Sequence, residues 1–111
     1  MFTLSPDWVH ETVKFKKGAV ALKLTVDADS FRMVTALRQA QQELSGLTDE
    51  ATEEAQQAAA LHFAAAIFGD EQARALLHFY HDDVACVINV CGQYFSKRLK
   101  KKIIRAQKKT K

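Results

Sequence analysis

Hydrophobic and polar residues alternate along two stretches near the start of the chain. The apolar positions are Val9, Val13 and Phe15 in the first stretch and Val20, Leu22, Leu24 and Val26 in the second. This period of two residues is typical of half-buried strands. A two-residue turn at Lys17-Gly18 would join them into a hairpin over about 9–26, pairing Phe15 with Val20, Val13 with Leu22 and Val9 with Val26. All of these side chains then share one face, and Lys14, Lys16 and Lys23 lie on the opposite, wet face.

The rest of the chain changes to the helical spacing of three and four residues. We predict helices over about 29–45, 49–68, 71–80 and 83–96. N-cap residues precede each one, namely Asp27 to Ser30, Thr48 and Asp49, Asp70, and Asp82 or Asp83. Ser45-Gly46 and Gly69 are suited to ending the first two helices. A lone hairpin is marginally stable, so its apolar face must pack on helices. The sequence therefore predicts an α+β fold, with an N-terminal β-hairpin packed on a bundle of about four α-helices.

Charge divides the chain into two parts. The whole chain has 111 residues, which fits one domain, and a net charge of +3. Residues 1–96 carry seven Lys or Arg and thirteen Asp or Glu, so their net charge is −6. Residues 97–111 carry nine Lys or Arg and no acid, so their net charge is +9. We expect residues 1–96 to form a single globular domain and residues 97–111 to form a basic C-terminal helical extension or tail.

Two further observations concern the cellular setting. No run of about 18 apolar residues occurs, and the N-terminus MFTLSPDWVH lacks the basic start of a signal peptide. A cytoplasmic location without membrane contact is therefore expected. Cys86 and Cys91 lie five positions apart in an apolar helix and point to different faces, so we expect two reduced, buried thiols.

The segment HFYHDDVACVINVC, from His78 to Cys91, concentrates residues that could bind a metal. A structural zinc site needs four well-placed ligands, and His78, His81 and Asp82 would supply three. The alternative is simpler, because Asp82 or Asp83 stands where a helix N-cap is needed between two apolar segments. The cap explanation is favoured, with surface histidines beside it, and no metal site is predicted.

Catalytic chemistry finds little support in the sequence. His62 lies between Leu61 and Phe63, where we expect a partly buried packing residue. A Cys–His nucleophile pair would need a setting that stabilises a thiolate, and the apolar surroundings of both cysteines argue against one. No phosphate-binding glycine loop, G-x-S-x-G or H-E-x-x-H occurs. We predict no catalytic residues, no metal and no cofactor.

The basic segment is the strongest compositional signal. Its candidate partner-binding residues are Lys97, Arg98, Lys100, Lys101, Lys102, Arg105, Lys108 and Lys109. They could bind nucleic acid non-specifically, or dock on an acidic protein surface such as another copy of the chain. They could also simply be solvated at a helix C-terminus, which favours cations. Leu99, Ile103 and Ile104 give only a narrow apolar stripe, which is weak for a membrane-bound helix.

A resemblance covers about residues 63–109. An apolar helix ends in Phe68-Gly69, an acid-capped helix of the form xxAxxLLxFY follows, and an Asp-capped helix with Tyr94-Phe95 leads to a Lys-rich end. This order resembles small proteins encoded among the tail genes of siphoviruses and prophages of Gram-positive bacteria, including tail assembly chaperones. The hairpin segment FKKGAVALKL also fits this resemblance. It implies a non-enzymatic helper that binds the tape-measure or tail-tube protein in the host cytoplasm, and it supplies no site residues.

The leading hypothesis is thus a chaperone-like factor of phage tail assembly. A small, non-specific nucleic-acid-binding protein acting through the basic tail is the alternative, and a metal-dependent enzyme at His78 and His81 is a third. Under the leading hypothesis, deletion of residues 97–111 is expected to weaken partner binding and to leave the fold cooperative.

Overall fold

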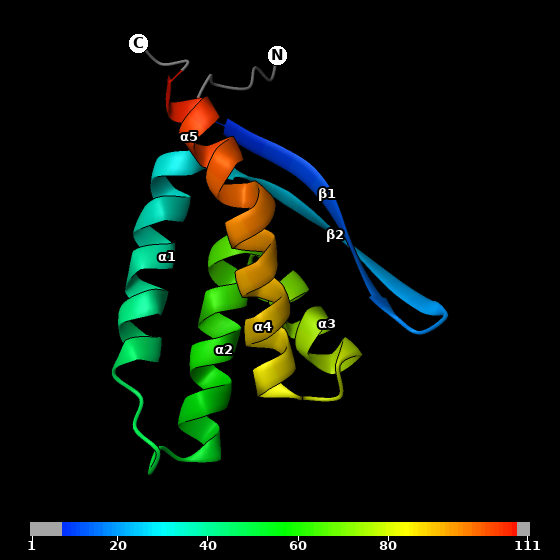
Figure 1. Cartoon of the computed structure of the whole chain (residues 1–111), viewed down its shortest axis with the longest axis vertical. Helices are drawn as coiled ribbons and strands as arrows, with labels where there is room; N and C mark the ends of the chain where they lie inside the picture. The colour runs from blue at the N-terminus through cyan, green and yellow to red at the C-terminus, as the bar shows by residue number, and fades with distance from the viewer. Residues whose placement is uncertain (1–7, 109–111) are drawn as a thin grey trace.

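The computed structural model describes residues 8–108. An antiparallel hairpin of β1 (Trp8–Lys17) and β2 (Val20–Asp29) precedes α1 (Ser30–Ser45), α2 (Glu53–Phe68), α3 (Asp70–Phe79) and α4 (Val84–Tyr94). A π-helical turn, η1 (Phe95–Leu99), connects α4 to α5 (Lys100–Lys108), and the three run on as one helical rod (Figure 1). The predicted α+β fold, a hairpin followed by four helices, is confirmed.

The hairpin has the predicted apolar face but a different register. Its loop is Gly18-Ala19, so Phe15 pairs with Leu22, Val13 with Leu24 and Val9 with Ala28. The predicted loop at Lys17-Gly18 was wrong, because it would place Lys17 at the first central position, which has positive φ in both tight hairpin turns. Gly18 occupies that position instead, with a φ of +61°. The pairing moves by two residues, and an even shift leaves every side chain on its predicted face.

Polar side chains fix several helix starts. Asp29 accepts a hydrogen bond from the Phe31 N–H at 2.8 Å and caps α1, as predicted. The second helix begins later than predicted, because the hydroxyl of Thr52, not Thr48 or Asp49, accepts from the Ala55 N–H at 3.1 Å. Asp70 is also not a cap. It is the first residue of α3, and Gly69 takes the cap position without a side-chain bond.

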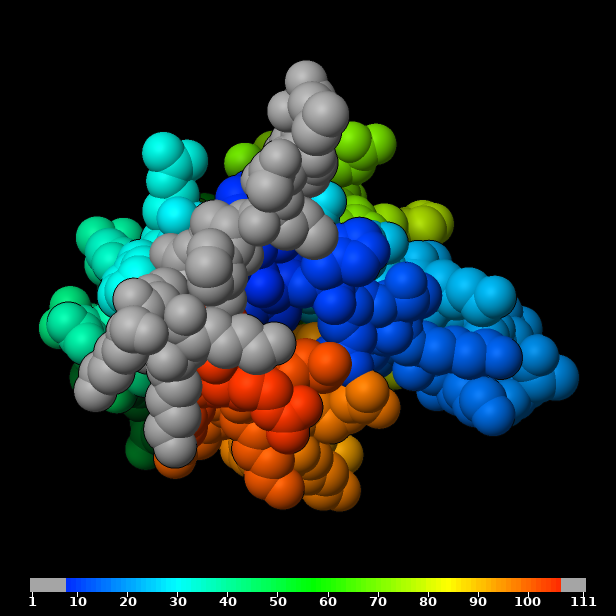
Figure 2. All heavy atoms as spheres, turned by 90° about the horizontal axis from the view of Figure 1, so that it is seen from above, coloured from blue at the N-terminus to red at the C-terminus, as the bar shows by residue number. Residues whose placement is uncertain are grey.

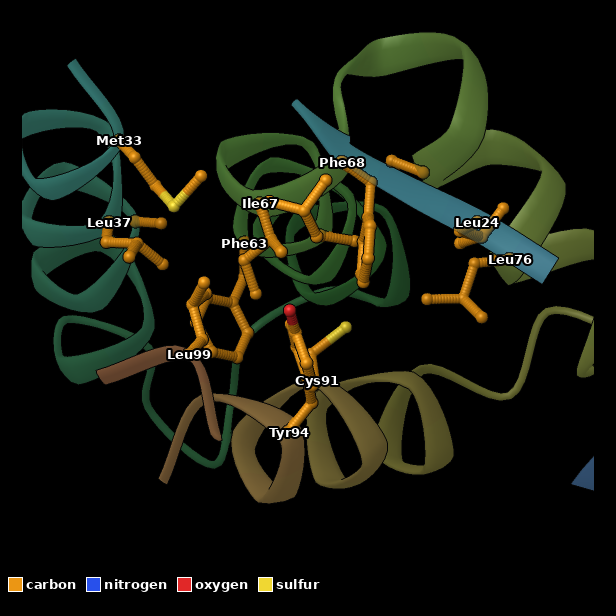
Figure 3. Packing of buried hydrophobic residues seen from close by; sticks show 14 of the residues in the cluster. Leu24, Met33, Leu37, Phe63, Ile67, Phe68, Leu76, Cys91, Tyr94 and Leu99 are labelled. Carbon is orange, nitrogen blue, oxygen red and sulfur yellow. The ribbon is translucent and has the colours of Figure 1, made fainter. Parts of the chain in front are cut away.

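The core is centred on α2, which contacts α1, α3, α4 and β2. Its alanines Ala59, Ala60 and Ala64 are fully buried, and such small side chains let neighbouring helices approach closely. Figure 3 shows buried side chains from β2, from α1 to α4 and from η1 around Phe63 and Ile67 of α2. They include Leu24, Met33, Leu37, Phe68, Leu76, Cys91, Tyr94 and Leu99. Hydrophobic burial of these side chains is the main term that stabilises the fold.

Three aromatic rings connect the hairpin to the helices. The Phe15 ring of β1 meets the Phe68 ring of α2 edge-on, with 5.7 Å between centroids. The Phe68 ring in turn stacks against Tyr94 of α4 at 5.9 Å. Such pairs add about 0.5–1.5 kcal/mol each beyond the area they bury. The apolar face of the hairpin is thereby fixed against the C-terminal end of α2 and the end of α4.

Candidate functional site

The helical rod changes geometry where its basic residues begin. In η1 the N–H of Lys100 bonds to the carbonyl of Phe95, five residues earlier. A π-helical turn holds more residues than an α-helical turn and is frequent at functional sites. The core-facing positions of the rod accordingly step from Tyr94 to Leu99, and then to Ile103 and Ala106. At this turn Tyr94 takes the buried position, and the neighbouring Phe95 is only half-buried.

A buried carboxylate lies opposite this turn. Glu11 is on the apolar face of β1 and is only 9% exposed. Its Oε2 accepts a hydrogen bond from the hydroxyl of Tyr94 at 2.6 Å, and its Oε1 is bound by the guanidinium of Arg98. The Nζ of Lys102 lies 3.6 Å from the same Oε1. Two cations and a hydroxyl thus compensate one buried charge, which would be strongly destabilising alone.

Sequence reasoning did not single out Glu11. The available signal was its position, since it is an acid between Val9 and Val13 on the strand face that is otherwise apolar. A buried acid requires partners from elsewhere in the chain, and the basic C-terminal segment was the evident source.

The Tyr94 hydroxyl is a hydrogen-bond donor in this cluster. Burial raises the pKa of Tyr94 well above its ordinary value of 10.0, and the hydrogen bond and charge of Glu11 raise it further, although Arg98 acts in the opposite direction. Tyr94 therefore remains a protonated donor at neutral pH. The side chain of Arg98 is 64% exposed, so only part of it is taken up by Glu11.

The other predicted partner-binding residues have different surroundings. Lys97, Lys100, Lys101 and Arg105 are exposed. Lys108 is the last residue of α5, and Lys109 lies outside the described residues. The basic segment is thus divided between two cations that face Glu11 and a larger group that faces solvent.

The same segment contributes to the core. Leu99, Ile103 and Ala106 are buried, and α5 contacts both α1 and β1. Deletion of residues 97–111 would therefore remove core side chains together with both cations that compensate Glu11. We therefore expect the truncation to destabilise the fold, so single surface substitutions are the appropriate test of binding by this segment.

An apolar groove of about 280 Å³ lies between α1 and the rod. Its lining residues are Val34, Leu37, Arg38, Gln41, Phe95, Lys100, Ile103 and Ile104. Ile104 is 43% exposed, which is high for so large an apolar side chain. The groove combines an apolar floor with cations on both walls.

A second groove, of about 520 Å³, lies between β1 and the rod. One wall is β1 from Glu11 to Lys16, and the other consists of Tyr80, Val90, Gln93, Tyr94, Lys97 and Arg98. Figure 2 shows β1, in blue, on the near face of the molecule, with the hairpin projecting beyond the orange rod beside it. Glu11, Tyr94 and Arg98 of the buried-carboxylate cluster all line this groove.

His81, Asp82 and Asp83 form the turn between α3 and α4. The N–H of Asp82 bonds to the Leu77 carbonyl at 2.9 Å, and the N–H of His81 to the His78 carbonyl at 3.0 Å. This is the Schellman pattern of a helix C-terminus. Asp83 then caps α4 by accepting from the Cys86 N–H at 3.1 Å. Within residues 8–108, no group of three or more His, Cys, Asp or Glu side chains is placed to hold a metal ion.

The remaining candidate residues differ in burial. Both cysteines are free thiols, but only Cys91 is buried; Cys86 is half-exposed, so the expectation of two buried thiols was wrong. Burial raises the pKa of Cys91 to about 12, which keeps it protonated and unreactive. His62 is exposed, not packed as predicted, and its Nδ1 lies 2.8 Å from the carboxylate of Glu43 on α1.

The chain was compared with family models, with curated proteins and with solved structures, and none of the three comparisons found a match. In the part of the chain that the structure describes, no helix is both long enough and apolar enough to cross a membrane.

Proposed function

We propose that this chain is a non-enzymatic factor that binds another protein during assembly, in the manner of the phage tail assembly chaperones that its sequence resembles. The proposed partner is the tape-measure or tail-tube protein, in the cytoplasm of the host cell. The observation that carries the proposal is the groove between α1 and the rod, where Ile104 is exposed and Val34 and Phe95 are half-buried beside cations.

The shape and chemistry of this groove suit an amphipathic helix. Helices bind in such grooves by placing apolar residues at steps of three and four against the floor. Ile104 and Val34 supply apolar contacts from opposite walls. Arg38 and Lys100 flank them, so acidic residues beside the apolar stripe of the partner would be favoured.

The potentially reactive groups support binding rather than catalysis. The Cys91 thiol is buried, with its pKa raised to about 12. The Glu11 carboxylate is held by Tyr94, Arg98 and Lys102. These groups act within the fold, whereas the exposed apolar side chains have no such role.

A binding measurement with point variants tests the proposal. Tape-measure and tail-tube proteins of siphoviruses are immobilised, and the wild type is compared with Ile104→Glu. We expect the variant to bind about ten-fold more weakly or worse, because a carboxylate replaces an apolar contact. Val20→Glu is the matched control, since Val20 is 61% exposed on the hairpin and does not line the groove. Equal binding by wild type and Ile104→Glu, or no capture of either protein, would overturn the proposal.

Nucleic-acid binding is the second candidate. Lys97, Lys101 and Arg105 are spaced by four residues along the rod and are all exposed. Cations in this arrangement can follow phosphates and release counterions. A salt titration with duplex DNA tests it, and absence of binding at low salt would exclude it.

A further inference from the structure

The outer edges of β1 and β2 differ in their hydrogen bonding. The outer edge of β2 is closed at Thr25 by Gln72 of α3. The Thr25 N–H donates to Gln72 Oε1 at 2.9 Å, and Gln72 Nε2 donates to the Thr25 carbonyl at 2.7 Å. Nε2 also donates to the Phe68 carbonyl at 2.8 Å, which fixes the amide in place. One side chain therefore occupies the position of a neighbouring strand.

These bonds also establish which groups of β1 point outward. Thr25 lies opposite Thr12, and its backbone groups point away from β1, so the two do not exchange ladder bonds. Pairs alternate along an antiparallel ladder. The backbone N–H and carbonyl groups of Thr12, Lys14 and Lys16 therefore point away from β2. Among the described residues these groups have no hydrogen-bond partner.

The open groove between β1 and the rod lies beside this free edge. From Thr12 to Lys16 the edge extends about 14 Å, at ~3.4 Å per residue. An extended segment of about five residues could pair with it. A strand added here would continue both faces of the sheet. Its inner side chains would meet Tyr80 and Val90 across the groove. Its outer side chains would lie beside those of Lys14 and Lys16, which are exposed.

Charge selects the kind of strand that fits. The groove is lined by the cations Lys14, Lys16, Lys97 and Arg98 and by one acid, Glu11, which is already compensated. Edge lysines commonly prevent strands from pairing with copies of themselves. A second copy of β1 would oppose lysine with lysine, and directly opposed like charges are destabilising. A segment with acidic side chains would instead be attracted by these lysines.

We infer that the β1 edge from Thr12 to Lys16 is a pairing site for an extended segment of a partner protein in which apolar and acidic residues alternate. Main-chain hydrogen bonds would provide affinity, and the lysines would provide selectivity. This site is separate from the groove between α1 and the rod, so it does not depend on the proposed function.

The probe is a fluorescent peptide of about six residues, the usual length of a strand, in which valine and glutamate alternate. Its anisotropy is measured with the full chain. We expect saturable binding to the wild type, with affinity at least about ten-fold lower for Lys14→Pro, which removes an outward N–H. The matched control is Lys23→Pro on β2. Lys23 lies directly opposite Lys14, so this variant also loses one lysine and one N–H outside the ladder. It should bind within about two-fold of the wild type.

A chemical control does not depend on the fold of any variant. N-methylation of alternate amides of the peptide removes its strand-pairing donors and leaves its charge unchanged. We expect this peptide to bind about ten-fold more weakly or not at all. Equal binding by both peptides, or an equal effect of the two proline variants, would show attraction of polyanions without strand pairing and would overturn the inference. Binding of oligo-dT that is as strong as that of the peptide and competes with it would also overturn the inference. So would a dimer of this chain that Lys14→Pro dissociates, or the absence of any peptide binding.

Discussion

The side-chain amide of Gln72 bonds to both backbone groups of Thr25, at 2.9 and 2.7 Å, as a paired strand would. We predict that Gln72→Ala lowers the free energy of unfolding by about 1–3 kcal/mol, because the three hydrogen bonds of the amide are lost and each contributes ~1 kcal/mol. Urea denaturation measures this loss. Gln93→Ala is the control, since Gln93 is exposed and makes only a long contact of 3.4 Å with Asn89. Equal losses in the two variants would contradict the role of Gln72.

The Tyr94 hydroxyl should stabilise the fold through Glu11. Tyr94→Phe keeps the ring stacked on Phe68 but leaves one oxygen of a buried carboxylate without its donor. A hydrogen bond to a charged group contributes about 1.5–3 kcal/mol, so the free energy of unfolding should fall by that amount. Tyr80→Phe is the matched control, because Tyr80 is half-buried and its hydroxyl makes no hydrogen bond within the described residues. It should change stability by less than about 0.5 kcal/mol.

Stability should decrease in alkaline solution. The pKa of Cys91 is about 12 in the folded chain, against an ordinary value of 9.0. Between these values the unfolded chain releases the thiol proton and the folded chain retains it. The contribution is therefore complete below pH 9.0 and is lost as the pH rises towards 12. Burial also raises the pKa of Tyr80 and Tyr94 from 10.0, so both add to the loss at higher pH.

Substitution of Cys91 isolates its share of this effect. In Cys91→Ala, the urea midpoint should fall less steeply between pH 9.0 and 10.0 than in the wild type, because the tyrosines contribute mainly above that interval. The slope, not the absolute midpoint, is the relevant measurement, since alanine also leaves a small cavity. An unchanged slope would mean that Cys91 does not titrate on unfolding.

The turn after α3 offers a substitution that should stabilise the protein. His81 follows the helix in the left-handed conformation, with a φ of 55°, which glycine adopts without steric cost. His81→Gly should raise the free energy of unfolding by about 0.5–1 kcal/mol. His78→Gly should have the opposite sign and lower it by ~1 kcal/mol, because His78 lies inside α3. The two variants compared by thermal or urea unfolding test the assignment, and shifts of the same sign would refute it.

The fold was predictable from the sequence where one local pattern decided the outcome. The alternation around Val13 and Phe15 determined the face of the hairpin, and Asp83 was correctly among the caps of α4. The hairpin register was not predictable from alternation, because an even shift preserves every face. The start of α2 was misplaced because Thr48, Asp49 and Thr52 are all adequate caps, and sequence alone does not single out Thr52, which is the one used.

The candidate site was less accessible to sequence reasoning. Composition identified the basic segment, but not that Arg98 and Lys102 face Glu11. The positions of Arg98 and Lys102 depend on the extra residue of the π-helical turn, and no local sequence pattern predicted this turn. The free edge of β1 likewise became apparent only once Gln72 was found against β2.

The ion pair of Glu11 with Arg98 joins residues 87 positions apart. During synthesis the hairpin leaves the ribosome before the helices, with its acid unmatched and its apolar face uncovered. Arg98 follows only after α1, α2, α3 and α4 have been made. The native contacts of the hairpin can therefore form only once Arg98 has emerged, and until then the nascent chain presents an open hairpin to other proteins. Folding of the hairpin therefore does not proceed segment by segment.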